Sequence, residues 1–313
     1  MNALRYAGSP GPVESYFLRL NDPAAPRAAW VKLTVLAPLQ GPAVLETWFV
    51  AFDGPRVYGH RDTLPFADPA WPLSAGSYRL DLDGGHVEGR CGEAAFNLDY
   101  APRPGVGASL SIFPFDWMLS GPFPKSKLVT PVPFADFRGS IDVFGERWDA
   151  SGWTGMQGHN WGREHAPAYA WGQCTFDGEV PAMVEAFSGK IRLGSRLSPW
   201  ISALVLRHGT AEYRFDNVVD LWRQEPVVGD DRWTLRVRGA SGEVRLRMSA
   251  AKVPSACLGY RNPDGTLAYC FNSKLADTLV EVEPRRGAAF HLSSPHGGAV
   301  EFLRPETGEG EGI

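Results

Sequence analysis

The segment 151–174 gathers polar and aromatic side chains whose types could do chemistry. It holds two of the seven histidines, His159 and His165, and glycines at 152, 155, 158 and 162 separate the polar groups. Because glycine admits backbone conformations with positive φ, we expect a tightly folded loop that aims side chains inward. A histidine beside Asn160 and Trp161 can have its tautomer fixed by a neighbour and its pKa tuned by apolar walls, as general acid–base chemistry requires. The pattern makes His159 a candidate acid, or the group that orients one.

A structural interpretation of the same segment stays open. A buried pair of His159 and Asn160 could serve only to hydrogen-bond irregular backbone where two domains join. His165 is expected on the surface or in a loop. The residue types alone do not decide between a chemical and a structural role for this segment.

Other kinds of site find less support. His159, Glu164 and His165 could bind a metal ion, but their spacing matches no zinc motif such as H-E-x-x-H. No G-x-S-x-G motif is present, and no phosphate-binding glycine loop precedes a helix. We therefore predict no metal site, no serine nucleophile and no nucleotide site.

Three charged residues interrupt apolar strand patterns: Lys32 in WVKLTV, Glu46 in VLETWF and Glu185 in AMVEAF. An unpaired buried charge is costly, so each should have a partner or line a cavity. For Lys32 we favour a strand edge with the ammonium group in solvent. Glu46 and Glu185 are the second candidates for a catalytic acid after His159. Lys125 and Lys127 are expected to face solvent.

The elements that position these residues are mostly strands. Period-two alternation and turn residues predict strands or hairpins at 30–36, 44–52, 77–90, 213–223, 232–248 and 279–284. We expect no long helix, and short ones only near 66–75 or 115–121. Gly and Pro make up about a fifth of the 313 residues, against roughly 12% on average, which suits short elements joined by turns. The sequence predicts an antiparallel all-β protein.

Two similar β-domains would suit this length. WFVAFDG (48–54) resembles WGQCTFDG (171–178), a weak sign of duplication. We place an N-terminal domain at 1–166 and a C-terminal domain at 167–313, with the boundary in the loop 151–166. The acidic tail 306–313 is expected to be disordered.

Composition excludes several classes of protein. The net charge of −4 argues against a nucleic-acid partner. No apolar run is long enough to cross a membrane, and the N-terminus lacks the apolar core of a signal peptide. Four cysteines do not make a disulfide framework. We expect a cytoplasmic protein with at most transient contact with a membrane.

The residues also carry a family resemblance. GMQGHNWG (155–162), followed by YAWGQC (169–174), resembles the central motif of the tocopherol cyclase and carotenoid 1,2-hydratase (hydroxyneurosporene synthase) superfamily. There a strand leads into an H-N-W-G or H-E-W-G loop and then into an aromatic strand. The segments 14–36, 126–153 and 270–282 resemble the family's opening strands, its lead-in hairpin and its closing strand pair. Carotenoid hydratases often carry Asp-His before the motif, whereas this chain has Gln157 and Gly158.

The resemblance implies two lipocalin-like β-barrels in tandem that work without metal or organic cofactor. Members protonate or hydrate an alkene of a prenyl-type substrate, or guide a cyclisation, in an apolar pocket. Such chemistry needs an acid, aromatic faces that stabilise positive charge, and a dry site. The residues that we expect to contact substrate are Asn160, Trp161, Trp153, His165, Trp171, Gln173 and Trp48.

Our leading interpretation is a cofactor-independent lyase, isomerase or cyclase acting on a hydrophobic, isoprenoid- or polyketide-like small molecule at the domain interface. The alternative is a non-catalytic carrier of hydrophobic ligands with the same fold. A structural protein with a filled interior and a sugar-binding β-protein are further possibilities. An enzyme differs from a carrier in aiming a titratable group with a shifted pKa into the pocket.

Overall fold

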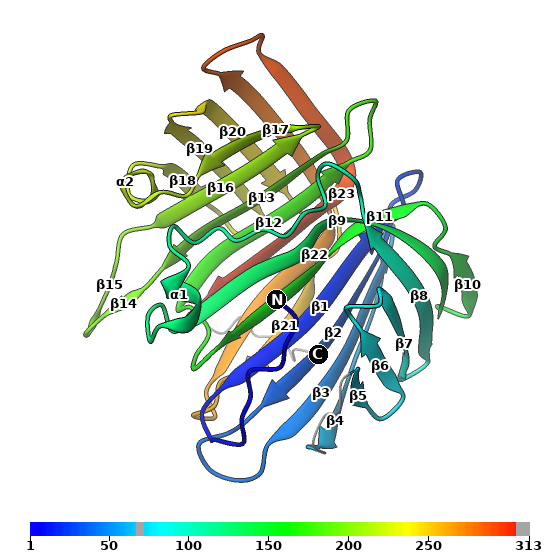
Figure 1. The fold of residues 1–313 in the computed structure, drawn as a ribbon. Helices are drawn as coiled ribbons and strands as arrows, with labels where there is room; N and C mark the ends of the chain where they lie inside the picture. Colours follow the sequence, from blue (N-terminus) through cyan, green and yellow to red (C-terminus); the bar gives the residue numbers. More distant parts are fainter. Residues whose placement is uncertain (67–71, 305–313) are drawn as a thin grey trace.

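The structure is a computed structural model that describes residues 1–66 and 72–304. Our expectations of a disordered tail at 306–313 and, in part, of a helix near 66–75 fall outside the described residues. The described residues form two large antiparallel sheets and one small hairpin (Figure 1). The predicted all-β fold class is confirmed.

The first sheet has eleven strands in the order β4-β3-β2-β1-β11-β9-β8-β7-β6-β5, with β10 paired to β9, and curls into a nearly closed barrel. Its strands are β1 (Val13–Asn21), β2 (Arg27–Leu36), β3 (Val44–Asp53), β4 (Arg56–Pro65), β5 (Leu73–Ala75), β6 (Tyr78–Asp81), β7 (His86–Cys91), β8 (Ala94–Pro102), β9 (Ser126–Val143), β10 (Glu146–Asp149) and β11 (Trp153–Gly162).

The second sheet has ten strands in the order β17-β16-β13-β12-β23-β22-β20-β19-β18, with β21 paired to β22. Its strands are β12 (Ala168–Phe176), β13 (Ala182–Lys190), β16 (Ile201–His208), β17 (Ala211–Phe215), β18 (Glu225–Val228), β19 (Arg232–Gly239), β20 (Gly242–Ser249), β21 (Ala256–Arg261), β22 (Leu267–Pro284) and β23 (Phe290–Arg304). The hairpin consists of β14 (Arg192–Leu193) and β15 (Arg196–Leu197). The chain leaves the first sheet at Gly162 and enters the second at Ala168; our division into domains at residue 166 stays a prediction.

Two helices of four residues each, α1 (Trp117–Ser120) and α2 (Val218–Leu221), complete the described elements. In the described part of the chain, no helix has the length and apolar character that crossing a membrane requires. The predicted short helix at 115–121 is confirmed by α1. The strand predicted at 213–223 is wrong after Phe215, because the Asn217 side chain accepts a hydrogen bond from the Asp220 backbone and starts α2 there.

The loop predicted at 151–166 is also wrong for most of its length, because β11 runs through it between β1 and β9. Gly152 before the strand has a positive φ of 82°, whereas the three glycines of β11 allow the close approach of neighbouring groups. A Cβ at Gly155 would lie 1.9 Å from the Arg19 carbonyl oxygen, and one at Gly158 would lie 2.2 Å from the Phe17 ring. The expected closing strand pair at 270–282 is a single long strand, β22, whose pairing with β23 shifts register between Ser273 and Thr278.

Strand alternation gives the central strands two buried faces. On β1, Tyr16 and Leu18 point into the first barrel, whereas Phe17 points toward the second sheet. On β2, Val31 belongs to the barrel core and Trp30 to the core shared by both sheets. This shared core explains why the predicted strands at 30–36 and 44–52 are apolar on both faces.

Candidate functional site

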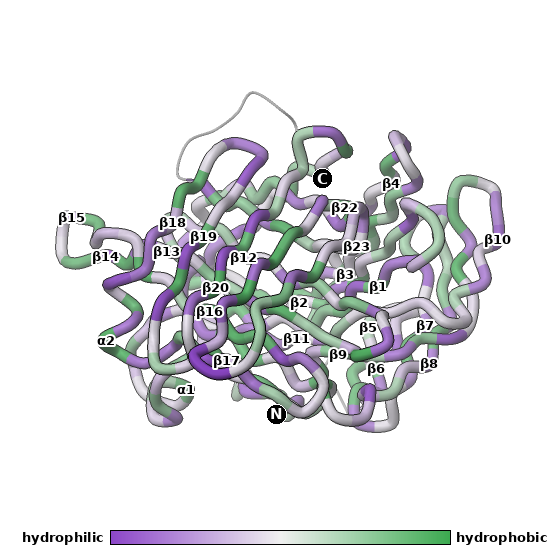
Figure 2. The backbone as a smooth tube through the Cα atoms, turned by 90° about the horizontal axis from the view of Figure 1, so that it is seen from above, coloured by the Kyte–Doolittle hydropathy of each residue, from purple (hydrophilic) through white to green (hydrophobic). Residues whose placement is uncertain are grey.

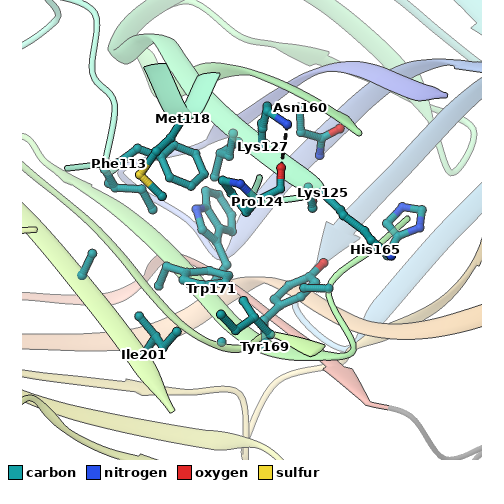
Figure 3. A pocket seen from close by; sticks show the side chains of 18 of the residues that line it. Phe113, Met118, Pro124, Lys125, Lys127, Asn160, His165, Tyr169, Trp171 and Ile201 are labelled. Atoms are coloured by element: carbon teal, nitrogen blue, oxygen red, sulfur yellow. Dashed lines mark hydrogen bonds between the residues drawn. The ribbon is translucent and has the colours of Figure 1, made fainter. Parts of the chain in front are cut away.

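A cavity of about 460 Å³ lies where β1, β2 and β11 of the first sheet face β12, β13 and β16 of the second. Its volume falls in the range of small-molecule sites, roughly 300–1,000 Å³. Parts of the segment 112–128 and of helix α2 also belong to its wall. Figure 3 shows labelled side chains from several of these segments around one space. The apolar wall includes Phe17, Trp30, Ile112, Phe113, Phe115, Trp117, Met118, Trp171, Phe187, Ile201, Leu221 and Trp222.

A group of polar side chains, Lys32, His165, Tyr260 and Glu301, lines another part of the wall; we call it the cavity cluster. The Lys32 Nζ atom lies 4.0 Å from the centroid of the Tyr260 ring. The His165 ring stacks on the same tyrosine at 5.2 Å between centroids. Tyr260 therefore brings an ammonium group and an imidazole together at the edge of an apolar space.

The tautomer of His165 follows from its hydrogen bonds. The Asn262 Oδ1 atom lies 2.8 Å from His165 Nδ1 and 2.9 Å from its backbone nitrogen. The Asn262 Nδ2 atom donates to Thr266 Oγ1 at 3.1 Å, so Oδ1 is the acceptor and His165 Nδ1 carries a proton. Burial, and then the charge of Lys32, lower the pKa of His165 to about 4, against the Asn262 hydrogen bond. At neutral pH the imidazole is uncharged, with Nε2 as a proton acceptor.

Lys32 differs from the other buried lysine nearby. Lys274 donates to Glu301 Oε1 at 2.7 Å, and Asn272 Nδ2 donates to the same oxygen at 2.8 Å. By contrast, Lys32 is 4% exposed and its Nζ makes no hydrogen bond or ion pair with a described residue. Burial lowers the pKa of Lys32 to about 8, although the charges of Glu301 and Glu46 oppose this shift. Our expectation that the Lys32 ammonium reaches solvent is wrong, because the second sheet covers this face of β2.

His159 lies on the other face of β11, inside the first barrel. It is 0% exposed and stacks on the Tyr16 ring at 4.3 Å. Its Nε2 lies 2.8 Å from Glu14 Oε1, and its Nδ1 lies 2.8 Å from the Met1 carbonyl oxygen. Burial raises the pKa of Glu14, but hydrogen bonds from His159 and Tyr16 outweigh it and leave that pKa below its ordinary value. We call His159, Glu14 and Tyr16 the Glu14 cluster. Both ring nitrogens of His159 lie within hydrogen-bond distance of an oxygen atom.

The structure brings three of the predicted site residues to the cavity: Asn160, His165 and Trp171. Glu185 lies next to this wall, because Trp171 Nε1 donates to its Oε1 at 3.1 Å. Thr130 Oγ1 also donates to the Glu185 carboxyl group, at 2.8 Å. Burial raises the pKa of Glu185 despite these hydrogen bonds.

The other predicted residues lie elsewhere. Gln173 is buried, accepts a hydrogen bond from Arg19 and donates to the Pro133 carbonyl oxygen. Trp48 packs against Trp30 and Tyr260, next to the cavity wall. Glu46 is buried on β3, and its Oε1 has no hydrogen-bond partner among the described residues. Trp153 belongs to the core of the first barrel, and Trp161 lies beside His159 with Arg5 over its ring. The catalytic roles of His159, Glu46 and Glu185 stay predictions.

Sequence reasoning missed Glu301 and Tyr260 as members of the site. Glu301 interrupts the apolar run AVEFL (299–303), the same signal that drew attention to Lys32. Our expectation that Lys127 faces solvent is wrong. Its side chain is 7% exposed, and its Nζ donates to the Pro124 carbonyl oxygen at 2.6 Å (Figure 3). Among the described residues, no group of three or more His, Cys, Asp or Glu side chains is arranged to hold a metal ion.

The chain is similar in sequence or in structure to several known proteins. No protein-family model matches the chain. It is 26% identical over 312 residues to the uncharacterized proteins MT0513 and Rv0493c of two Mycobacterium tuberculosis strains, which covers 98% of this chain and 92% of each relative. The similarity to these relatives therefore extends over nearly the whole chain.

Three solved structures share the fold. Kievitone hydratase from Nectria haematococca matches with a TM-score of 0.59 at 11% identity, over 95% of this chain and 90% of that one. An AttH-type protein from Nitrosomonas europaea matches with a TM-score of 0.56 at 13% identity, over 94% and 92%. CghA, solved with Sch210972, matches with a TM-score of 0.51 at 15% identity, over 94% and 89%. The chain therefore has the lipocalin-like fold of these structures, as the resemblance in the sequence implied.

Proposed function

We propose that the protein is a lyase, isomerase or cyclase that transforms a hydrophobic small molecule in the cavity between its two sheets. The observation that carries the proposal is the neutral imidazole of His165 at the wall of an apolar cavity. A passive carrier needs the apolar wall but has no need of a titratable group with a shifted pKa. The fold shared with kievitone hydratase and CghA supports the same general kind of reaction.

The chemistry follows from the tautomer of His165. With Nδ1 held by Asn262, Nε2 can take a proton from a substrate carbon or hydroxyl group and return it at another position. Moving a proton in this way shifts a double bond, adds or removes water, or starts a ring closure. The apolar wall excludes bulk water, so the proton that Nε2 takes up is returned to the substrate rather than lost to solvent. We infer an isoprenoid- or polyketide-like substrate, because such molecules combine an apolar skeleton with alkene and oxygen groups.

The test combines ligand identification with two variants. The protein is purified gently from its own host, and bound small molecules are identified by native mass spectrometry. Ile201→Trp fills the cavity from β16, and His165→Phe keeps the ring on Tyr260 but removes both nitrogens. Thermal unfolding first checks that both variants fold.

We expect wild type to bind and convert an apolar compound from the host extract, His165→Phe to bind it unchanged, and Ile201→Trp to bind none. The loss of conversion in His165→Phe should be on the order of 10²- to 10⁴-fold. A compound bound but left unchanged by wild type would make the protein a carrier. Full conversion by His165→Phe would also overturn the proposal, as would a wild-type protein that takes up no apolar compound.

A further inference from the structure

Lys32 is a buried cation of the cavity wall that makes neither an ion pair nor a hydrogen bond with a described residue. Lys32 follows Trp30 by two positions on β2, so both side chains point toward the second sheet. The Lys32 ammonium rests on aromatic faces, 4.0 Å from the Tyr260 centroid, and no carboxylate oxygen of a described residue lies within ion-pair distance of it. Cation–π contacts replace only part of the water that the ammonium group gave up.

The charged groups around Lys32 belong to several elements. Glu46 lies on β3, Glu301 on β23, and Lys274 and Cys270 on β22. His165 lies in the connection between the two sheets, and its own pKa is lowered in part by the charge of Lys32. Glu301 already accepts hydrogen bonds from Lys274 and Asn272 at Oε1, and its carboxylate lies outside ion-pair distance of Lys32. The free donors of Lys32 therefore need an acceptor that enters the cavity from outside.

We propose that Lys32 binds a carboxylate at one end of the hydrophobic ligand, so that the ligand is an apolar acid. A carboxylate accepts hydrogen bonds from the ammonium and supplies the counter-charge that the site lacks. The apolar part of the molecule then lies along Trp171, Phe187 and Ile201. This proposal rests on the cavity of the proposed function and names the class of its ligand.

The binding of two probes that differ only in the head group tests the proposed carboxylate site without any catalytic turnover. Dodecanoic acid and methyl dodecanoate have the same chain and differ in the charge of the head group. Their affinities are measured by calorimetry for wild type, Lys32→Met, Lys32→Gln and Lys127→Met. Lys127 is the matched control, since it also lines the cavity and is buried but already has an acceptor in Pro124.

We expect wild type to bind the acid about 10- to 100-fold more tightly than the ester, the range of a hydrogen bond to a charged group. Lys32→Met and Lys32→Gln should lose this preference and keep their affinity for the ester, whereas Lys127→Met should keep both. The preference of wild type should weaken as the pH rises from 7 to above 9, because the pKa of Lys32 is about 8. Equal binding of acid and ester by wild type, no binding of either, or an unchanged preference in both Lys32 variants would overturn the proposal. If the acid preference holds but no conversion is found, the proposed reaction fails and this binding site stands.

A different observation concerns the outer surface beside the cavity. Large hydrophobic side chains are exposed on the segment around α1, on the β14–β15 hairpin and on α2, which lie on the same side of the molecule in both views (Figures 1 and 2). Trp117 is 56% exposed and Trp222 is 50% exposed, and both also line the cavity. We call this surface the rim; its exposed apolar residues are Phe115, Trp117, Phe123, Leu193, Leu197, Val218, Val219 and Trp222.

The rim is basic although the chain as a whole is acidic. Arg192, Arg196 and Arg223 are exposed on its segments and form no ion pair with a described residue, whereas Asp116 is the exposed acidic residue of α1's N-cap. The whole chain carries a net charge of −4. Exposed tryptophans combined with unpaired arginines are typical of a surface that enters the headgroup region of an anionic bilayer.

We infer that the rim docks on an anionic membrane surface, where the mouth of the cavity can exchange apolar molecules with the lipid. This inference does not depend on any reaction. Flotation with phosphatidylcholine vesicles, with and without phosphatidylglycerol, tests it for wild type, the double variant Trp117→Ser/Trp222→Ser and the double variant Arg192→Ser/Arg196→Ser. Leu39→Ser is the control, since Leu39 is equally exposed in the connection from β2 to β3.

We expect wild type and Leu39→Ser to float only with the vesicles that contain phosphatidylglycerol, and salt to weaken this binding. Both double variants should lose at least ten-fold in affinity. A wild type that binds neither kind of vesicle would overturn the inference. So would self-association of wild type that the tryptophan variant abolishes, because a second copy would then cover the rim.

Discussion

The Glu14 cluster and the cavity cluster each contain a histidine from the same short segment, yet they differ in how completely their polar atoms are used. In the Glu14 cluster, both nitrogens of His159 have partners, and the histidine is sealed inside the first barrel. In the cavity cluster, Nδ1 is the ring nitrogen of His165 that Asn262 holds, and Lys32 makes no hydrogen bond with a described residue. A cluster whose groups are all satisfied stabilises the fold, whereas one with free donors and acceptors beside a cavity can receive a ligand.

The largest effect that would test this contrast is on stability. We expect His159→Ala to lower the free energy of unfolding by roughly 3–5 kcal/mol, because it removes the imidazole that pairs with the buried Glu14 carboxylate. Urea denaturation measures the loss. Since Glu14→Gln removes the stranded charge, the double variant should lose less than the sum of the single variants. A loss below about 1 kcal/mol in His159→Ala would show that the Glu14 cluster is not the structural one.

A second comparison separates the two lysines beside Glu301. Lys274→Met breaks a buried ion pair, so we expect it to cost about 3 kcal/mol of stability. Lys32→Met removes a buried charge that has no counter-ion in contact, so its stability should equal or exceed that of wild type. Urea titrations measure the free energy of unfolding of both variants. If Lys32→Met destabilised the protein as much as Lys274→Met, the ammonium would have a structural role.

The cavity histidine should matter much less for folding than His159. His165→Phe removes the hydrogen bond from Nδ1, but the backbone nitrogen of the same residue still donates to Asn262. We therefore expect a loss of about 1 kcal/mol or less. A thermal unfolding midpoint close to that of wild type would agree with this, and a loss like that of His159→Ala would contradict it.

The smallest expected effect is a change in how the free energy of unfolding depends on pH. Burial raises the pKa of Glu185, so its carboxyl group stays protonated in the folded state after the unfolded chain has ionised. Its contribution to stability is complete below the unfolded pKa and is lost as the pH rises toward the folded pKa. Glu185→Gln should remove this slope, so its stability should gain on that of wild type as the pH rises above the ordinary pKa of a glutamate. Parallel stability curves for the two proteins would contradict this.

Much of the fold could be predicted because alternation is a local signal. The strands at 30–36 and 44–52 and the hairpins at 77–90 and 232–248 lie where the sequence places them. The strand β11 was missed because its glycines are required by contacts with residues that are distant in the sequence. Nothing near Gly155 in the sequence says that the Arg19 carbonyl group will approach it.

The site was predictable only in part, for a related reason. Asn160, His165 and Trp171 stand out in one short segment, and all three line the cavity. The pattern around Lys32 identifies a charge in an apolar strand, but whether it meets solvent depends on the second sheet. Glu301 comes from the far end of the chain, and only the folded structure brings it to the cavity.

The paired strands β1 and β11 separate the core of the first barrel from the cavity between the two sheets. Tyr16 and Phe17 are neighbours on β1, and they face His159 and Gly158 on β11. A molecule that rests against Phe17 therefore stabilises backbone hydrogen bonds that also hold the barrel core. By linkage, filling the cavity should slow hydrogen exchange at the β1 and β11 amides, so that the first barrel reports the occupancy of a space outside it.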